Sequence, residues 1–156
     1  MDAPKSDVEK LLACLTARKV RFVVVGEYAL AIHGRSRFTK DVDVFVEPAH
    51  ENAERLLLAL GDFGFGSLGL VAVDFSTPGR IVQLGVTPNR VDLITAIDGV
   101  SLAEAWDGRA IGHFGARPVS SLGRQELLRN KRAAGCRQDL ADIDALQWPR
   151  VGLITN

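Results

Sequence analysis

The chain has few cysteines and no long hydrophobic run. Its two cysteines, Cys14 and Cys136, match no metal-binding or redox spacing. No apolar run approaches the roughly 18 residues that a membrane-spanning helix needs. The N-terminal segment also lacks the apolar core and the small-residue cleavage site of a signal peptide. Together these absences predict a reduced, cytoplasmic protein with no membrane partner.

Net charge is absent as well, because 19 basic residues balance 19 acidic ones. A general attraction of the whole molecule to nucleic acid is therefore not indicated. The basic residues nevertheless gather in two clusters, one before residue 41 and one in the last third of the chain: Arg35, Arg37 and Lys40, then Arg124, Arg129, Lys131, Arg132 and Arg137. Either cluster can be a solvated face, but both lie beside the chemical signals described below.

What remains is the composition of an ordinary globular protein. The chain is 47% hydrophobic and 24% charged, which is normal for a folded domain. Its 156 residues suffice for one domain to bury most of the surface that the unfolded chain exposes. We therefore expect a single domain over residues 1–156, with a C-terminal helical segment at about 120–148.

Apolar residues recur at helical and strand spacings along most of the chain. A capping-box pair, Ser6 and Glu9, starts the first expected helix. We expect helices at 6–15, 28–33, 50–60, 102–106, 124–134 and 139–146, strands at 21–26, 41–46, 70–75, 81–86 and 90–95, and a hairpin or strand at 109–117. This order predicts an α+β fold in which a mixed β-sheet carries its helices mainly on one face.

Two aspartates open the strand expected at 41–46. Residues i and i+2 of a strand point to the same face, so Asp41 and Asp43 project together while the valines between and after them face the core. Two carboxylates held this close repel each other, and partial burial strengthens the repulsion. A proton or a cation relieves it, and hard oxygen ligands favour magnesium or manganese. The same spacing also fits the wet face of a surface strand.

A third carboxylate, Asp92, interrupts another apolar strand, where an unpaired charge would be costly. If this strand neighbours the strand of Asp43, three carboxylates converge on one patch. Such a patch can hold one or two magnesium ions, which activate an attacking hydroxyl and stabilise a leaving pyrophosphate. The alternative is that Asp92 pairs with an arginine such as Arg90.

The order of these motifs resembles a known family. Residues 26–30, 33–37, Thr39 and 41–44 together resemble the nucleotidyltransferase superfamily of DNA polymerase β type, and most closely a small bacterial branch that includes AbiEii- and MenT-like toxins. Residues 91–100 are similar to the third-carboxylate strand of that branch, and residues 127–142 to its C-terminal helical signature. The resemblance covers roughly residues 23–146.

The resemblance implies that Asp41, Asp43 and Asp92 bind Mg²⁺ or Mn²⁺ and carry catalysis. It further implies that a nucleoside triphosphate binds beside the phosphate-contacting turn, the residues just before the aspartates and a lysine of the C-terminal helix: Gly26, Glu27, Arg37, Thr39 and Lys131. Taken alone, Gly26 can equally be a simple turn. His33 is either a hydrogen-bonded residue that packs the short helix or a catalytic one, and Arg137 is either a surface residue or a phosphate ligand.

Two positions depart from the family pattern. The phosphate-contacting turn usually carries a second small residue, where this chain has Glu27. Its charge would oppose a triphosphate by about 1 kcal/mol unless it turns away or pairs with Arg35 or Lys40. The C-terminal signature usually runs Gly-Arg-x-Lys-Asp, whereas residues 135–139 here are Gly-Cys-Arg-Gln-Asp. Both changes bear on the affinity for triphosphate rather than on the fold.

The function implied is transfer of a nucleoside monophosphate from a nucleoside triphosphate to a hydroxyl acceptor. An RNA end, such as that of a tRNA, is the first acceptor to consider, with an antitoxin protein as partner in a toxin-like role. One alternative is a nucleotide-binding protein of the same fold that has lost efficient catalysis. Transfer to a small molecule of aminoglycoside type, or to a protein hydroxyl, is a further alternative. A D-x-D sugar-nucleotide transferase fits less well, because the chain is short and Asp92 would have no role.

Overall fold

A computed structural model describes residues 3–33, 42–85, 90–114 and 117–135. The helices are α1 Ala3–Ala17, α2 Gly26–Ile32, α3 His50–Phe63, α4 Val73–Ser76, α5 Leu102–Asp107 and α6 Arg124–Ala134, with a 3₁₀ turn, η1, at Gly66–Leu68. The strands are β1 Phe22–Val25, β2 Val42–Val46, β3 Ile81–Leu84, β4 Val91–Ile94, β5 Ala110–Phe114 and β6 Arg117–Ser121. The helix expected at 139–146 lies outside the described residues.

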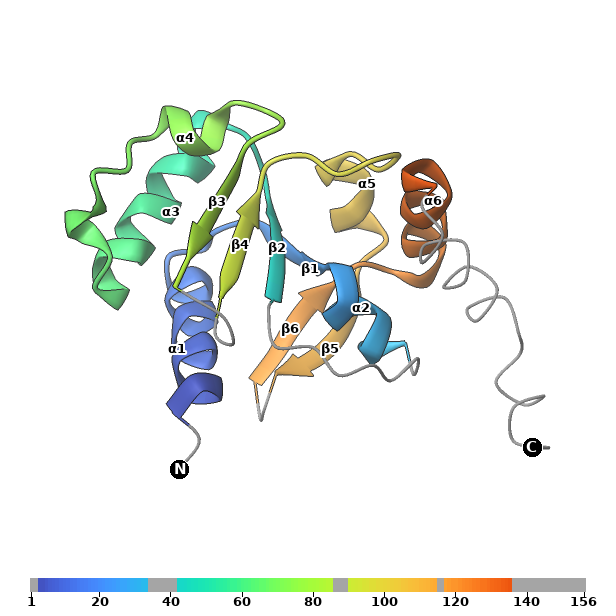
Figure 1. Cartoon of the computed structure of the whole chain (residues 1–156), viewed down its shortest axis with the longest axis horizontal. Coiled ribbons are helices and arrows are strands. Elements are labelled where there is room, and N and C mark those ends of the chain that lie inside the picture. Colours follow the sequence, from blue (N-terminus) through green and yellow to red (C-terminus); the bar gives the residue numbers. More distant parts are fainter. Residues whose placement is uncertain (1–2, 34–41, 86–89, 115–116, 136–156) are drawn as a thin grey trace.

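The six strands form one sheet in the order β3-β4-β2-β1-β6-β5 (Figure 1). Strand β2 runs parallel to β4 and β1 runs parallel to β6, while the other neighbours are antiparallel. The expected mixed sheet of an α+β fold is therefore confirmed. Strands β2 and β4 are neighbours inside the sheet although 44 residues separate Val46 from Val91 in the sequence.

Both faces of the central strands are covered by helices. Val24, Val44 and Leu93 pack with α1, α3 and the short helix α4 in one apolar cluster. Val23, Val25 and Phe45 lie on the opposite face and pack with α2, α5 and α6 in a second cluster. Figure 1 shows the two groups of helices on opposite sides of the sheet. The expectation that helices pack mainly on one face is therefore wrong, and the reason lies in β1, whose four residues are all buried hydrophobic side chains.

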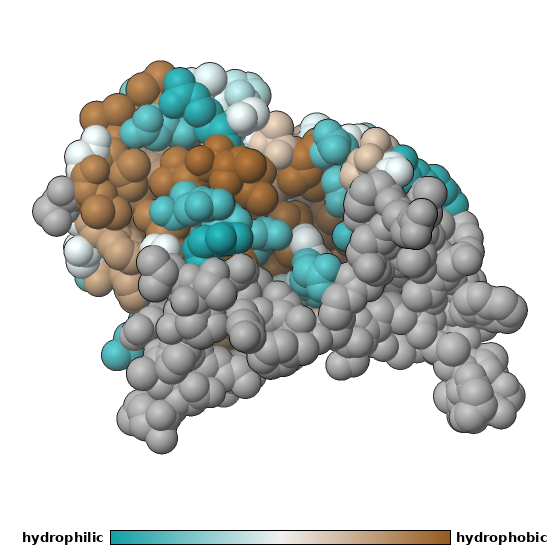
Figure 2. Space-filling view, in the orientation of Figure 1, coloured by the Kyte–Doolittle hydropathy of each residue, from teal (hydrophilic) through white to brown (hydrophobic). Residues whose placement is uncertain are grey.

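The segment at 70–75, expected as a strand, instead leads into α4. The Val71 amide donates to the Asp74 carboxylate at 2.8 Å, which closes a local turn. Only Phe75 is buried there, whereas Val71 and Val73 are each 53% exposed, so the apolar alternation does not form a half-buried strand. Ile81 on the edge strand β3 is 62% exposed as well, and Figure 2 shows apolar side chains gathered on this side of the molecule.

Candidate active site

Two of the three predicted carboxylates lie side by side on neighbouring strands inside the sheet. Asp43 of β2 and Asp92 of β4 are direct partners in the parallel register, so both side chains leave the same face of the sheet. This is the face that carries α2, α5 and α6. Asp43 is half-buried and Asp92 is 8% exposed. The strand neighbourhood that the three-carboxylate hypothesis required is thus present, although Asp41 lies outside the described residues.

Gly26 sits directly against the first of these carboxylates. Val25, the residue before it, is the antiparallel partner of Asp43, and Gly26 then turns the chain into α2 with a φ of +71°. A Cβ atom on Gly26 would collide with Oδ2 of Asp43 and would lie 3.2 Å from Cγ of the same carboxyl group. Glycine is required here both by the left-handed backbone and by the close approach of the carboxylate. A ligand of Asp43 would therefore pass close to the Gly26 backbone.

Replacing Gly26 with alanine is expected to lower both stability and activity. The left-handed backbone and the displaced carboxylate together would cost about 1–3 kcal/mol, a typical range for stored backbone strain. Thermal unfolding and transfer rates would show the effect. Gly79→Ala is the matched control, because it also has a positive φ of +84° but no atom within 4 Å of its Cβ position. Equal losses of activity in the two variants would assign the effect to backbone strain alone.

Asp92 also has a cationic partner. The Arg90 Nε lies 3.0 Å from Oδ1 of Asp92, and the Arg90 Nη2 donates to Oδ2 at 3.4 Å. The pairing with Arg90 that the sequence left open is therefore observed together with the Asp43 neighbourhood, not instead of it. Their i, i+2 spacing on one strand is the sequence signal for this contact.

The donor set fits a hard divalent cation. Oδ1 of Asp92 is buried and accepts a hydrogen bond from no described residue, because its approach to Arg90 is an ion pair without hydrogen-bond geometry. An oxygen in that state, beside a second carboxylate on the next strand, suits Mg²⁺ or Mn²⁺. Within the described ranges no three His, Cys, Asp or Glu side chains group as a metal site. Asp43 and Asp92 would therefore be two of the ligands, with Asp41 as the remaining candidate.

Lys131 lies on the buried side of α6, a helix that packs on this face of the sheet. Its side chain is 8% exposed and it follows Leu127 by one helical turn, so it is turned inward with the buried side of α6. The helix is fixed to the loop after β4. A Cβ on Gly99 would lie 2.8 Å from the Cβ of Ala133, and the Asn130 side-chain amide donates to the Asp98 carbonyl at 2.9 Å. The β4 strand and the predicted lysine are thus held in one unit.

Glu27 occupies the first turn of α2 and is half-buried. Its neighbour Tyr28 faces elsewhere, because its ring stacks on Phe114 at 4.7 Å between centroids. Burial, and then the charge of Glu9, raise the pKa of the Tyr28 hydroxyl. Tyr28 therefore stays neutral and does not supply a base to the carboxylate pair.

His33 is a hydrogen-bonded residue of the fold. Its Nε2 donates to the Leu122 carbonyl at 2.8 Å, which ties the end of α2 to the junction of β6 and α6. The structural role weighed for this histidine in the sequence is thus the one observed. Arg37, Thr39 and Arg137 lie outside the described residues.

Solved structures of nucleotidyl-transferring proteins share this fold. The crystal structure of ANT(2″)-Ia in complex with adenylyl-2″-tobramycin is 16% identical, covers 97% of this chain and 84% of its own, and has a TM-score of 0.53. A solution structure of the same antibiotic-resistance factor is 19% identical and covers 96% of this chain and 78% of its own, with a TM-score of 0.52. A candidate nucleotidyltransferase from Thermotoga maritima is 15% identical, covers 96% and 91%, and has a TM-score of 0.53. At these identities the likeness establishes the fold.

The sequence itself establishes the family. Residues 4–106 match the family described as nucleotidyl transferase of unknown function (DUF2204), and this chain belongs to it. The match contains Gly26, Asp43, Arg90 and Asp92, whereas Lys131 lies beyond it. No match was found among curated proteins. The resemblance to nucleotidyltransferases is therefore confirmed.

Proposed function

We propose that Asp43 and Asp92, with Asp41, hold Mg²⁺ or Mn²⁺ and direct transfer of a nucleoside monophosphate from a nucleoside triphosphate to a hydroxyl acceptor. The observation that carries this proposal is the register pair Asp43–Asp92 beside Gly26. When bound, the metal ion polarises the triphosphate and the attacking hydroxyl and stabilises the leaving pyrophosphate.

The residues of the chain then have separate tasks. Asp43 and Asp92 offer carboxylate oxygens to the metal ion from one face of the sheet. Asp92 acts either as a metal ligand or as the base that takes the proton lost by the attacking hydroxyl. The hydroxyl oxygen forms a bond to the α-phosphorus while the bond to pyrophosphate breaks. Gly26 lets the phosphates approach the backbone, and Lys131, with Arg37 and Thr39, is proposed to contact the nucleotide. Arg90 contacts the Asp92 carboxylate and would compete with, or orient Asp92 toward, a metal ion held there.

The acceptor divides the proposal into two candidates. The sequence resemblance to AbiEii- and MenT-like toxins favours an RNA end, and it would bring an antitoxin partner with it. The shared fold of ANT(2″)-Ia, solved with adenylyl-2″-tobramycin, favours a hydroxyl on a small molecule. We place the RNA end first, because the basic residues that flank the site in the sequence suit a short phosphate backbone.

Transfer of label from α-labelled nucleoside triphosphates separates these candidates. The protein is incubated with magnesium and, in parallel, with total RNA, an aminoglycoside mixture or a protein extract. Label on RNA supports the first candidate and label on the aminoglycosides the second. Micromolar nucleotide binding by calorimetry without label on any acceptor would instead support a binding protein that has lost efficient catalysis.

Glu27 sets the affinity for triphosphate in this proposal. Replacing it with glutamine removes one negative charge near the phosphates, and we expect the KM for triphosphate to fall about fivefold, as an unfavourable interaction of about 1 kcal/mol predicts. The turnover number should change little. Glu51→Gln, an exposed charge in the first turn of α3, is the matched control. A KM that rises in Glu27→Gln would show that Glu27 helps to assemble the site.

Two further expectations stay predictions. The single domain over residues 1–156 rests on length and composition, and a cytoplasmic location rests on the cysteine pattern. Within the described residues no helix is long and apolar enough to cross a membrane.

A further inference from the structure

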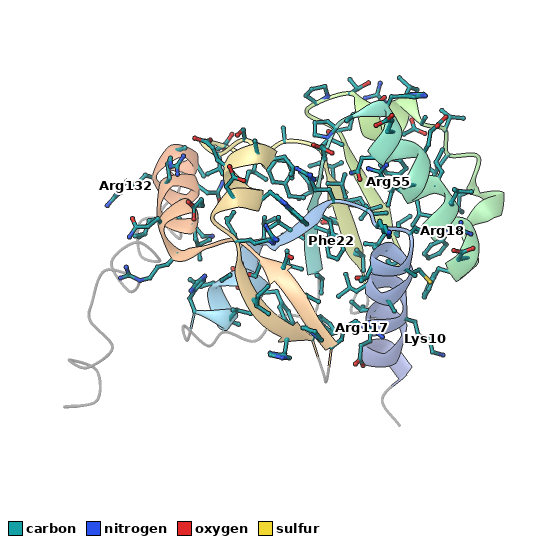
Figure 3. All side chains as sticks on the ribbon, turned by 180° about the vertical axis from the view of Figure 1, so that it is seen from behind. Lys10, Arg18, Phe22, Arg55, Arg117 and Arg132 are labelled. Atoms are coloured by element: carbon teal, nitrogen blue, oxygen red, sulfur yellow. The ribbon has the colours of Figure 1, made fainter. Side chains whose placement is uncertain are left out.

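A pocket lies at the other end of β1 from the carboxylates. Strands β1 and β6 share a single register pair, Val24 with Ser121. Residues around the start of β1 and in β6, with others from α1, α3, α5 and β5, line a pocket of about 410 Å³. Phe22, Ile111 and Val119 are among its apolar walls. Figure 3 shows Phe22 and Arg55 in this region, seen from behind.

Three cations line this pocket: Lys19, Arg21 and Arg55. Arg21 already interacts with two residues of the protein. Its Nε is 4.0 Å from a Glu47 carboxylate oxygen, and its Cζ lies over the Trp106 ring, 4.9 Å from the ring centroid. Among the described residues, Arg55 Nη2 donates one long hydrogen bond, of 3.5 Å, to the side-chain Oδ1 of Asn52, and its buried Nε has no hydrogen-bond partner there. Neither Lys19 nor Arg55 forms an ion pair with a described carboxylate, so their charges remain available to a ligand.

Lys19 is held in this position against its backbone preference. Its φ is +59°, and it is the one residue other than glycine with a positive φ in the described part of the chain. The Lys19 amide donates to the Thr16 carbonyl and the Val20 amide to the Leu15 carbonyl, both at 3.0 Å, which is the left-handed end of α1. Glycine suits such a position best, so the lysine there costs stability. What the lysine adds is a cation at the rim of the pocket.

We propose that this pocket binds a small organic phosphate, with the phosphate between Lys19 and Arg55 and its apolar part against Phe22, Ile111 and Val119. A doubly charged, multidentate group matches an ammonium and a guanidinium better than a carboxylate does. The volume and the apolar walls are those of a small-molecule site rather than of an RNA track. The pocket is separate from the carboxylate pair, because Phe22 pairs with Val46 and Val25 with Asp43 at opposite ends of β1.

Trp106 lines the pocket and provides the readout. The chain has one other tryptophan, Trp148, which lies outside the described residues. Replacing it with phenylalanine gives a background in which Trp106 is the only source of tryptophan fluorescence. Phenyl phosphate is titrated while Trp106 fluorescence is followed, with benzoate and inorganic phosphate as parallel probes. We expect a saturable change with phenyl phosphate and weaker binding of benzoate, which lacks the phosphate, and of inorganic phosphate, which lacks the ring.

Variants in that background locate the binding. Arg55→Gln and Lys19→Gly should each weaken phenyl phosphate binding about tenfold, as loss of a charged hydrogen bond predicts. Arg132→Gln, an exposed charge on α6 (Figure 3), should leave it unchanged. Lys19→Gly should also hold or raise the melting temperature, because it removes the left-handed strain. Binding should persist in Asp43→Asn, which shows that it does not depend on the carboxylate site.

Three results would overturn the proposal. The first is the absence of a saturable change with phenyl phosphate. The second is equal weakening in Arg132→Gln and Arg55→Gln. The third is loss of phenyl phosphate binding in Asp43→Asn, which would move the ligand to the carboxylate pair. If phenyl phosphate causes no change but a short single-stranded RNA binds saturably, the surface around Lys19 and Arg55 is an RNA-binding surface and not a small-molecule pocket.

Discussion

Asparagine in place of Asp43 is expected to reduce nucleotidyl transfer by more than about a hundredfold. Removing a residue that only orients a metal ligand already lowers metal affinity or activity by about 10–100-fold, and Asp43 is proposed as a ligand itself. The substitution keeps the shape of the side chain, so the contact with Gly26 should survive. Initial rates with labelled triphosphate measure the loss. Asp107→Asn, an exposed carboxylate at the end of α5, should keep the full rate.

Metal binding gives the same variant an independent readout. A ligand that binds only the folded state raises the melting temperature by mass action. We therefore expect Mn²⁺ to raise the melting temperature of the native protein and of Asp107→Asn, but not of Asp43→Asn. If Asp43→Asn loses activity while its response to Mn²⁺ is unchanged, Asp43 acts on the substrate and is not a metal ligand.

The separate strands could be predicted from sequence, but the way they meet could not. Alternation placed Asp43 opposite its valine neighbours, and an apolar strand interrupted by Asp92 was evident. Their direct pairing depends on β2 and β4 becoming parallel neighbours across a long stretch of chain, and no local pattern determines that. The register is nevertheless the observation on which the candidate site rests.

Two of the sequence predictions are wrong, and each has a physical reason. Residues 70–75 alternate like a strand, yet a single local contact, from the Val71 amide to the Asp74 carboxylate, closes a turn instead. Placing the helices mainly on one face overlooked β1, where four successive apolar residues indicate a strand buried on both faces. The Arg90 pairing is a different case, because the i, i+2 spacing lets Arg90 contact Asp92 while Asp92 stays beside Asp43.

Glutamine in place of Arg90 is expected to destabilise the metal-free protein by about 3 kcal/mol. Asp92 is 8% exposed, and removing one partner of a buried ion pair leaves the other charge uncompensated. The expected value lies at the lower end of the range for such pairs, because the Arg90 side chain is 31% exposed. Chemical denaturation without divalent cations measures it. Arg80→Gln is the control, since Arg80 also contacts an aspartate, Asp74, but at 3.6 Å and with its own side chain 50% exposed.

The stability gained on adding Mn²⁺, compared between the native protein and Arg90→Gln, then shows whether Arg90 and the metal ion compete for Asp92. Suppose that the Arg90 guanidinium balances the Asp92 charge only while no metal is bound. Mn²⁺ should then bind Arg90→Gln more tightly than the native protein and raise its stability by more. The guanidinium and the metal ion compete for the same carboxylate oxygens, so removing one favours the other. The variant would then show a lower metal requirement for transfer, even though it is less stable in the absence of metal. Equal stabilisation of both proteins by Mn²⁺ would instead mean that Arg90 and the metal occupy different sides of Asp92, with Arg90 orienting a ligand that it never releases.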